Sequence, residues 1–234
     1  MSLLVVRGLE VRYGGIRAVK GIDLEVRAGE VVSLIGANGA GKSTTLRALA
    51  GLVPVAAGQA LFDAVPLAGV PTHRRVGRGL ALVPEGRGVF ARLTVEENLL
   101  MGLAPVTGRA ARKLPEQILE TFPVLKQMLK RRGGDLSGGQ QQQLAIGRAL
   151  AANPRVLILD EPTEGIQPSI IKEIGAVIRA LVAKSTMAVL LVEQYYDFAE
   201  SLADGYAVMS RGRITHAGPG GEMHEKNVRE LIAI

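Results

Sequence analysis

The chain has 234 residues, and its 47% hydrophobic content is enough for the core of one large domain or two small ones, which excludes a disordered chain. Lysine and arginine outnumber aspartate and glutamate by 28 to 22. The resulting net charge of +6 suits nucleic acid, an anionic membrane surface or simple solubility, and it does not choose among them. The absence of cysteine excludes disulfides and thiolate metal sites and permits a reducing cytosol.

The apolar runs of the chain are short. The longest, 156–159 and 187–192, fall far below the roughly 20 residues that span a bilayer, so we expect a chain that does not cross a membrane alone. Charged residues come too early at the N-terminus for a secretory signal, and no small-residue cleavage pattern follows, so we also expect no export. No fixed-period repeat, heptad run or low-complexity tract is present, which indicates that the whole chain folds.

The N-terminal part predicts strands followed by one helix. Residues 1–30 alternate loosely between apolar and polar and are interrupted by glycines, which is typical of antiparallel hairpin strands. The run 31–35 is apolar throughout and bounded by glycine, which favours a buried parallel strand. A helix is expected from Lys42 to about Ala50, where Gly51 and Pro54 end it.

The middle of the chain, from about 86 to 152, is predicted to be mostly helical and to form a helical subdomain. Thr94 and Glu97 fit the pattern of a capping box at a helix start. Pro115 is expected at the first position of another helix.

The last part returns to alternating strands and helices. A strand over 156–160, an amphipathic helix over 169–184 and a strand over 187–192 predict a βαβ crossover. A short hairpin around Arg211 and Gly212 and a final helix over 222–234 are expected to follow.

A phosphate-binding loop is predicted between the strand at 31–35 and the helix that follows it. The sequence fits G-x-x-x-x-G-K-[ST] in the structural context that this motif needs, which disfavours the alternative of a glycine-rich turn with an accidental lysine. The lysine would contact the β- and γ-phosphates of ATP, and the serine hydroxyl would bind Mg²⁺. The predicted nucleotide-binding residues here are Gly36, Ala37, Asn38, Gly39, Ala40, Gly41, Lys42, Ser43 and Thr44.

Two carboxylates, Asp160 and Glu161, stand at the end of a second apolar strand. If the two strands lie side by side, both acids face the phosphate loop. Asp160 is then expected to hold Mg²⁺ through water, and Glu161 to polarise the water that attacks the γ-phosphate. The alternative, a pair of solvated acids at a strand end, becomes a minor one with a phosphate loop upstream.

The sequence Leu-Ser-Gly-Gly-Gln at 136–140 lies between these two motifs. With them, it resembles the ATPases of ABC transporters, and the resemblance covers essentially the full chain. Ser137 is a good helix N-cap, and Gly138 and Gly139 allow close backbone approach, so the helix start can face an anion. An ordinary helix cap, the alternative, leaves both glycines unexplained. Gln140 completes the signature.

The resemblance implies an α/β fold of the ABC-type P-loop ATPases, with a mixed β-sheet core, an N-terminal antiparallel β subdomain and an inserted helical subdomain. It implies a single domain over 1–234, in which 1–86 and 153–234 form the nucleotide-binding core and 87–152 the helical signature subdomain. In this family the signature of one subunit closes over the ATP held by the other, so two chains form two composite sites. Tyr13 matches the aromatic residue that stacks on adenine, although a core tyrosine is the alternative.

Three positions differ from the commonest pattern of the family. Glu85 stands where most relatives have the glutamine that touches Mg²⁺ and links to the membrane subunits, and a carboxylate can also bind Mg²⁺. Gln194 stands where a histidine usually reaches the γ-phosphate; its amide can donate a hydrogen bond but carries no proton for transfer. Gln167 replaces an aspartate of the loop after the acidic strand.

The implied partners are transmembrane permease subunits, a second copy or a paralogous ATPase subunit, and, indirectly, a periplasmic or extracellular solute-binding protein. The implied cofactors are ATP and Mg²⁺, and the implied location is peripheral, on the cytoplasmic face of the inner membrane. A non-transport ABC ATPase that acts on nucleic acid is the alternative. Its DNA-repair and chromosome members insert long coiled coils before the signature, and this chain has none, so we expect no nucleic acid.

The resemblance leaves two solute classes open. Residues 36–98 resemble ATPases of branched-chain amino-acid importers, whereas the segments 132–135, 140–143, 164–168 and 194–198 resemble those of urea and short-amide importers. Such a mixture is expected of an intermediate family member or of a recombined sequence.

Overall fold

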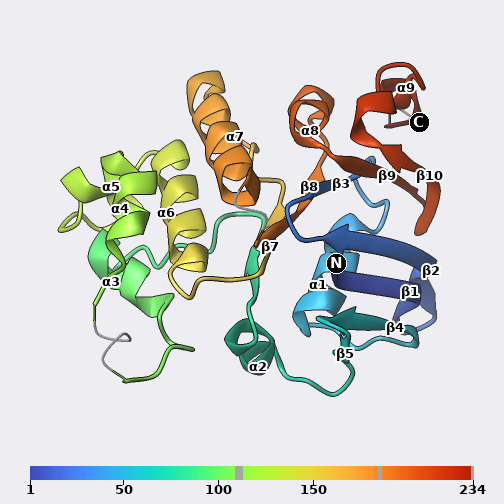
Figure 1. Cartoon of the computed structure of the whole chain (residues 1–234), viewed down its shortest axis with the longest axis horizontal. Helices are drawn as coiled ribbons and strands as arrows, with labels where there is room; N and C mark the ends of the chain where they lie inside the picture. Colours follow the sequence, from blue (N-terminus) through green and yellow to red (C-terminus); the bar gives the residue numbers. More distant parts are fainter. Residues whose placement is uncertain (109–112, 184–185, 233–234) are drawn as a thin grey trace.

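The computed structural model describes residues 1–108, 113–183 and 186–232, and two β-sheets organise them (Figure 1). The larger sheet has six strands in the order β10-β9-β3-β8-β7-β6. Five of them run parallel, and β10 lies antiparallel at the edge. The strands are β3 (Val31–Ile35), β6 (Leu80–Val83), β7 (Val156–Asp160), β8 (Ala188–Glu193), β9 (Gly205–Ser210) and β10 (Arg213–Pro219).

The smaller sheet is antiparallel and has the order β2-β1-β4-β5. The long hairpin of β1 and β2 turns at Gly14, whose positive φ of 57° is a conformation that glycine adopts without steric cost. Inward and outward side chains alternate loosely along both strands, as expected for a sheet with one covered face. The strands are β1 (Ser2–Tyr13), β2 (Ile16–Arg27), β4 (Ala57–Phe62) and β5 (Val65–Pro66).

Helices α3 to α6 gather in a lobe beside the two sheets, on the left in Figure 1. Reciprocal capping boxes start α3, where Thr94 pairs with Glu97, and α6, where Ser137 pairs with Gln140. The helices of this lobe are α3 (Val95–Met101), α4 (Glu116–Thr121), α5 (Pro123–Gln127) and α6 (Gly138–Leu150), with a 3-10 turn at Gly133–Asp135. The other helices are α1 (Lys42–Ala50), α2 (Thr72–Gly77), α7 (Pro168–Ala183), α8 (Tyr196–Leu202) and α9 (Val228–Ile232), with a 3-10 turn at Gly220–Glu222.

One hydrophobic cluster joins the helical lobe to the six-stranded sheet. It contains Leu99 of α3 and Ile146 of α6 together with Leu157 of β7 and Leu191 of β8, all fully buried. Every residue of β3, β7 and β8 is buried, which explains why these strands are apolar on both faces. The lobe and the sheet therefore share a core.

The predicted fold is confirmed: a mixed sheet, an antiparallel N-terminal sheet and an inserted group of helices are all present. The interior strands and α1 lie where the sequence predicts them, to within a residue. Pro115 caps α4 instead of opening it, and the helix predicted over 169–184 spans 168–183, with Lys184 outside the described residues. No helix of the described ranges is long and apolar enough to traverse a bilayer.

The prediction of one final helix over 222–234 is wrong. The chain forms a 3-10 turn at Gly220–Glu222 and then a short helix, α9, from Val228 to Ile232; residues 233–234 lie outside the described part. Asn227 between them has a positive φ of 47°, a left-handed conformation that an α-helix cannot contain. This residue separates the two helical pieces.

Candidate active site

The loop from Gly36 to Gly41 connects β3 to α1 and has the backbone that a phosphate cradle needs. A Cβ added at Gly36 would lie 2.2 Å from the carbonyl oxygen of Met209, so no other residue fits there. Gly41 has a φ of 110°, which L side chains rarely adopt, and it precedes α1 without any side-chain cap. The first N–H groups of α1 therefore have no side-chain cap, which is the arrangement that an anion can complete.

Lys42 lies across this loop and is almost completely buried, with a side chain that is 3% exposed. Its Nζ donates hydrogen bonds to the carbonyl oxygens of Gly36 at 2.7 Å and Ala37 at 3.2 Å. The same Nζ lies 3.4 Å from Oε1 of Glu161, so the acidic end of β7 is in contact with the phosphate loop.

Asp160 and Ser43 meet at the end of β7. The Ser43 hydroxyl donates to Oδ1 of Asp160 at 3.2 Å. Burial, helped by the nearby charges of Glu161 and Glu85, raises the pKa of Asp160 to about 6 against the opposing effects of Ser43 and Lys42. A cation would relieve this repulsion, and a hydroxyl with two carboxylates are the hard oxygen donors that Mg²⁺ prefers.

The described residues contain no group of three or more His, Asp and Glu side chains arranged to hold a metal ion by themselves. The proposed metal ligands include only two carboxylates, Asp160 and Glu85, so the fit requires that phosphate oxygens and water supply most of the coordination. This is the usual situation for Mg²⁺ bound with a nucleotide.

Glu161 and Gln194 are brought into direct contact by the parallel pairing of β7 and β8. Nε2 of Gln194 donates to Oε2 of Glu161 at 2.6 Å, while the backbone N–H of Glu161 donates to the Val192 carbonyl at 2.9 Å. Glu161 has a positive φ of 47°, an uncommon backbone conformation for a residue other than glycine. The loop thus aims the carboxylate back toward Lys42.

A cavity of about 340 Å³ opens over these groups. Of the residues predicted from sequence, Asn38, Gly39, Gly41, Lys42, Ser43, Thr44, Glu85 and Glu161 line it. Tyr13 does not; it is 44% exposed at the end of β1, and its cross-strand partner Ile16 lines the cavity instead.

Sequence reasoning missed three cations of this cavity: Arg17 and Lys20 of β2, and Arg211 in the turn between β9 and β10. The backbone N–H of Lys20 donates to the carbonyl of Gly212 at 2.8 Å, which ties the two segments together. No local pattern signals this contact, because β2 and the turn are far apart in the sequence. The three cations add positive charge where a triphosphate would lie.

The signature residues lie elsewhere. Ser137, Gly138, Gly139 and Gln140 start α6 in the helical lobe, and none of them lines the cavity (Figure 1). Oε1 of Gln140 accepts a hydrogen bond from the backbone N–H of Ser137 at 3.0 Å, and the side chain of Ser137 is exposed. The chain therefore does not bring its own signature to its own phosphate loop.

A phosphate cradle, a buried lysine and acidic residues at the ends of neighbouring parallel strands define the class of P-loop nucleoside triphosphatases. Comparison with known proteins gives the family. Residues 19–164 match the family model described as ABC transporter. A solved nucleotide-free ATP-binding cassette from an ABC transporter superposes with a TM-score of 0.86 at 28% identity and covers 100% of this chain and 98% of its own.

Two curated relatives support the same family. The high-affinity branched-chain amino acid transport ATP-binding protein BraG of Pseudomonas aeruginosa is 46% identical over 202 residues, 86% of each chain. The probable branched-chain amino acid transport ATP-binding protein LivF of Archaeoglobus fulgidus is 34% identical over 93% of each. The chain belongs to the ABC transporter family. It is an ATP-binding subunit that hydrolyses ATP, and the alternative of a nucleic-acid ATPase is not favoured.

Proposed function

We propose that the chain drives an importer of branched-chain amino acids by hydrolysing ATP in a dimer at the cytoplasmic face of the inner membrane. The hydrogen bond between Gln194 and Glu161, beside the buried Lys42, is the observation that carries the hydrolytic assignment. The similarity to BraG, which is named for branched-chain amino acid transport, supports the solute. Urea or a short amide is the second candidate solute, because residues 194–198 resemble the ATPases of urea and short-amide importers.

The residues of the cavity divide the work of hydrolysis. Residues 36–44, the loop and the first turn of α1, would hold the phosphates through backbone N–H groups and Lys42, and Tyr13 would stack on the adenine. Ser43, Asp160 and Glu85 would hold Mg²⁺, which neutralises charge on the phosphates. Glu161 would polarise the attacking water, and Gln194 would orient the Glu161 carboxylate and donate its amide to the γ-phosphate.

A second chain is needed to complete the site, because the signature at 137–140 does not reach the cavity of its own chain. We propose that a second copy or a paralogous ATPase places this helix start on the γ-phosphate. The division into a core, 1–86 and 153–234, and a helical signature subdomain, 87–152, supports this role because the signature can then move relative to the phosphate loop.

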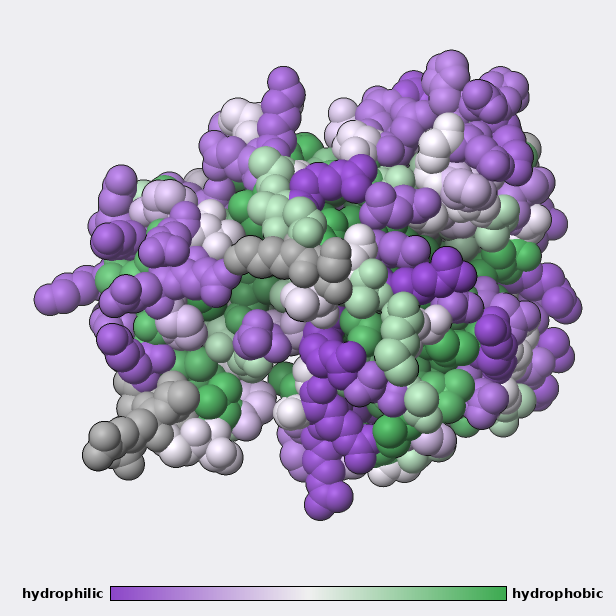
Figure 2. Space-filling view, in the orientation of Figure 1, coloured by the Kyte–Doolittle hydropathy of each residue, from purple (hydrophilic) through white to green (hydrophobic). Residues whose placement is uncertain are grey.

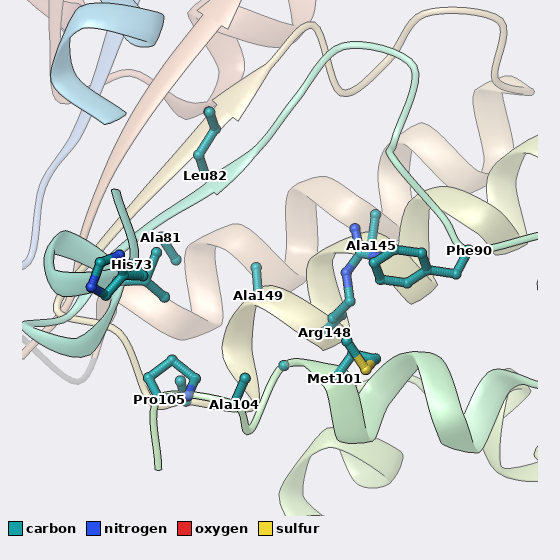
Figure 3. Close-up of a pocket in the computed structure, with 13 residues that line it drawn as sticks. His73, Ala81, Leu82, Phe90, Met101, Ala104, Pro105, Ala145, Arg148 and Ala149 are labelled. Atoms are coloured by element: carbon teal, nitrogen blue, oxygen red, sulfur yellow. The ribbon is translucent and has the colours of Figure 1, made fainter. Parts of the chain in front are cut away.

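The permease is proposed to dock in a groove of about 450 Å³ between α2 and β6 on one side and α3 and α6 on the other (Figure 3). His73 lines one end, and Phe90 and Arg148 lie together at the other, with the guanidinium carbon of Arg148 5.0 Å from the ring centroid. Nη1 of Arg148 is buried and has no hydrogen-bond partner among the described residues.

The rim of the groove is basic. The exposed residues His73, Arg74 and Arg78 come from α2 and its end, where strongly hydrophilic side chains gather in Figure 2. We therefore expect a permease segment with an apolar face and an acidic or carbonyl group for Arg148. The groove is lined by residues of the nucleotide-binding core and of the helical lobe. A permease segment bound there would therefore follow the movement of one relative to the other. A solute-binding protein would act outside the membrane, without contact to this chain.

The test of the hydrolytic assignment is Glu161→Gln. Loss of the carboxylate removes the base, and we expect hydrolysis to fall at least about 100-fold while ATP binding persists and an ATP-bound dimer accumulates. Phosphate release measures hydrolysis, a fluorescent ATP analogue measures binding, and size-exclusion chromatography with ATP measures the dimer. If the Glu161→Gln variant still hydrolyses ATP, Glu161 is not the residue that polarises the attacking water.

The test of the solute uses the transporter purified from its native membrane through a tag on this chain and reconstituted in vesicles. ATP-dependent uptake of leucine, isoleucine and valine is expected, with no uptake of urea or acetamide. The opposite preference would replace the proposed solute with the second candidate and leave the ATPase assignment intact.

A further inference from the structure

Glu193, the last residue of β8, is a buried carboxylate that has no part in the proposed steps of ATP hydrolysis. Its exposed fraction is 2%. Oε1 accepts hydrogen bonds from the backbone N–H of Thr163 at 3.1 Å and from its hydroxyl at 2.8 Å. Oε2 accepts from the backbone N–H groups of Gln194 at 3.0 Å and Tyr195 at 3.2 Å. One side chain thus joins the loop after β7 to the loop after β8.

These two loops carry the proposed catalytic pair. Glu161 lies two residues before Thr163, and Gln194 directly follows Glu193. The Gln194 amide in turn donates to Glu161 at 2.6 Å. The chain from Glu161 to Thr163, the side chain of Glu193 and the side chain of Gln194 therefore form a closed ring of covalent and hydrogen bonds.

We propose that Glu193 is a positioning residue for ATP hydrolysis, which holds the loops of Glu161 and Gln194 at the separation that the reaction needs. The inference rests on the roles proposed for Glu161 and Gln194. It assigns Glu193 no contact with the nucleotide, because Glu193 does not line the cavity. It keeps the Glu161 carboxylate and the Gln194 amide at a fixed separation when ATP binds.

The chemistry of the site requires an acceptor with two oxygens. All four groups that face Glu193 are N–H or O–H donors, which an ionised carboxylate can satisfy and a primary amide cannot, since an amide has only one acceptor atom. Within the described ranges Glu193 forms no ion pair, and burial raises its pKa despite these hydrogen bonds. Burying a carboxylate without an opposite charge costs free energy. Because Glu193 lies between two loops of the site, we infer that the reaction requires it and that it is not there only for packing.

The experiment compares Glu193→Gln with the unmodified chain in the transporter assembled with its membrane partners. Glu193→Gln places an NH₂ group against N–H donors, so the two loops separate. A displacement of about 1 Å at a catalytic group costs about 100-fold in rate. We therefore expect kcat to fall about 10- to 100-fold while the KM for ATP and the affinity for a fluorescent ATP analogue stay within about 2-fold.

Two further variants separate positioning from general stability. Glu193→Asp keeps the charge and can still reach the neighbouring N–H groups of Gln194 and Tyr195, but it is too short for Thr163, so an intermediate kcat is expected. Glu200→Gln is the matched control. Glu200 is a partly buried glutamate of α8 that accepts a hydrogen bond from the Tyr196 hydroxyl at 2.8 Å, away from the cavity, and kcat should not change.

Thr163→Val provides a second route if Glu193→Gln does not fold, because it removes only the hydroxyl that donates to Glu193. It should lower kcat by a smaller factor and add little to Glu193→Gln, since both variants break the same link. Unchanged kcat in Glu193→Gln or in Thr163→Val, or a loss of ATP affinity that matches the loss of kcat, would overturn the inference. Glu161→Gln is measured in parallel: if it is active the proposed function fails, whereas an inactive Glu161→Gln beside a fully active Glu193→Gln sinks only the role of Glu193.

Discussion

Two helix starts of the chain are proposed to bind anions, and they differ in how their first N–H groups are satisfied. Helix α1 begins after Gly41 with no side-chain cap, beside the buried Lys42. Helix α6 begins with a complete capping box of Ser137 and Gln140, both near the surface. We expect the first start to bind phosphate within a single chain, whereas the second, with the N–H groups of Ser137 and Gln140 already capped, would meet the phosphate of another chain.

On the proposed function, this difference would allow one polypeptide to hold ATP without completing the reaction. The tight hydrogen bonds around Lys42 and Asp160 belong to a folded, buried edge of the sheet. The signature lies on a lobe that shares a core with the sheet but exposes its helix start. Binding and closure are therefore expected to respond to different mutations.

The largest effect is expected for Lys42→Ala. The variant removes the buried cation that the loop and Glu161 share, so the affinity for ATP should fall at least about 100-fold, the order associated with a buried charge-assisted contact. Titration with a fluorescent ATP analogue measures the affinity. Lys20→Ala, at the wall of the same cavity, is the comparison and should cost only a few-fold; equal affinities for Lys42→Ala and the unmodified chain would sink the phosphate-loop assignment.

An intermediate effect, confined to hydrolysis, is expected for Ser137→Ala. ATP affinity of the single chain should stay within about 2-fold, and hydrolysis at saturating ATP should fall about 10-fold, because the signature contributes only in the closed dimer. Loss of the cap also costs about 1 kcal/mol of stability. Thr94→Ala removes the equivalent cap of α3 and controls for that loss. If Thr94→Ala reduces hydrolysis as much as Ser137→Ala, the second helix start has no special role.

The smallest effect concerns stability without Mg²⁺ and nucleotide. The folded chain raises the pKa of Asp160 from 3.8 to about 6, so it favours the protonated acid. That contribution is fully present below about pH 4 and is lost as the pH rises through about 6. Asp160→Asn should therefore raise the Tm by a few degrees at pH 8 and leave it unchanged at pH 4. Thermal unfolding at both pH values measures this, and a gain that does not depend on pH would contradict the electrostatic origin.

The sequence predicts the backbone of the loop 36–41 and of the strand that ends in the two acids well, because each consists of consecutive residues whose conformation is largely local. The apolar runs at 31–35 and 156–160 are strands, and the glycines of the loop lie where positive φ or close contact requires them. The exposed signature follows the same rule, since its capping box needs only four residues.

The features that were missed depend on contacts between distant segments. Arg211 reaches the cavity only because β2 pairs with the turn after β9, and Glu193 acquires its partners only because β8 lies beside β7. Ile16 lines the cavity in place of Tyr13 because of the register of one hairpin. Asn227 interrupts the last helix through a backbone conformation that no pattern of apolar residues reveals.

The left-handed backbone of Glu161 has a consequence for how the site responds to ATP. A non-glycine residue at a φ of 47° stores about 1 kcal/mol or more, comparable with the net worth of a single hydrogen bond. The amide of Gln194 and the carbonyl of Val192 hold the residue there. The Gln194 amide carries two N–H groups, so one could donate to a γ-phosphate while the other keeps its hydrogen bond to Glu161. A small shift of this amide toward the phosphate would then change the restraint on the strained residue and move its carboxylate.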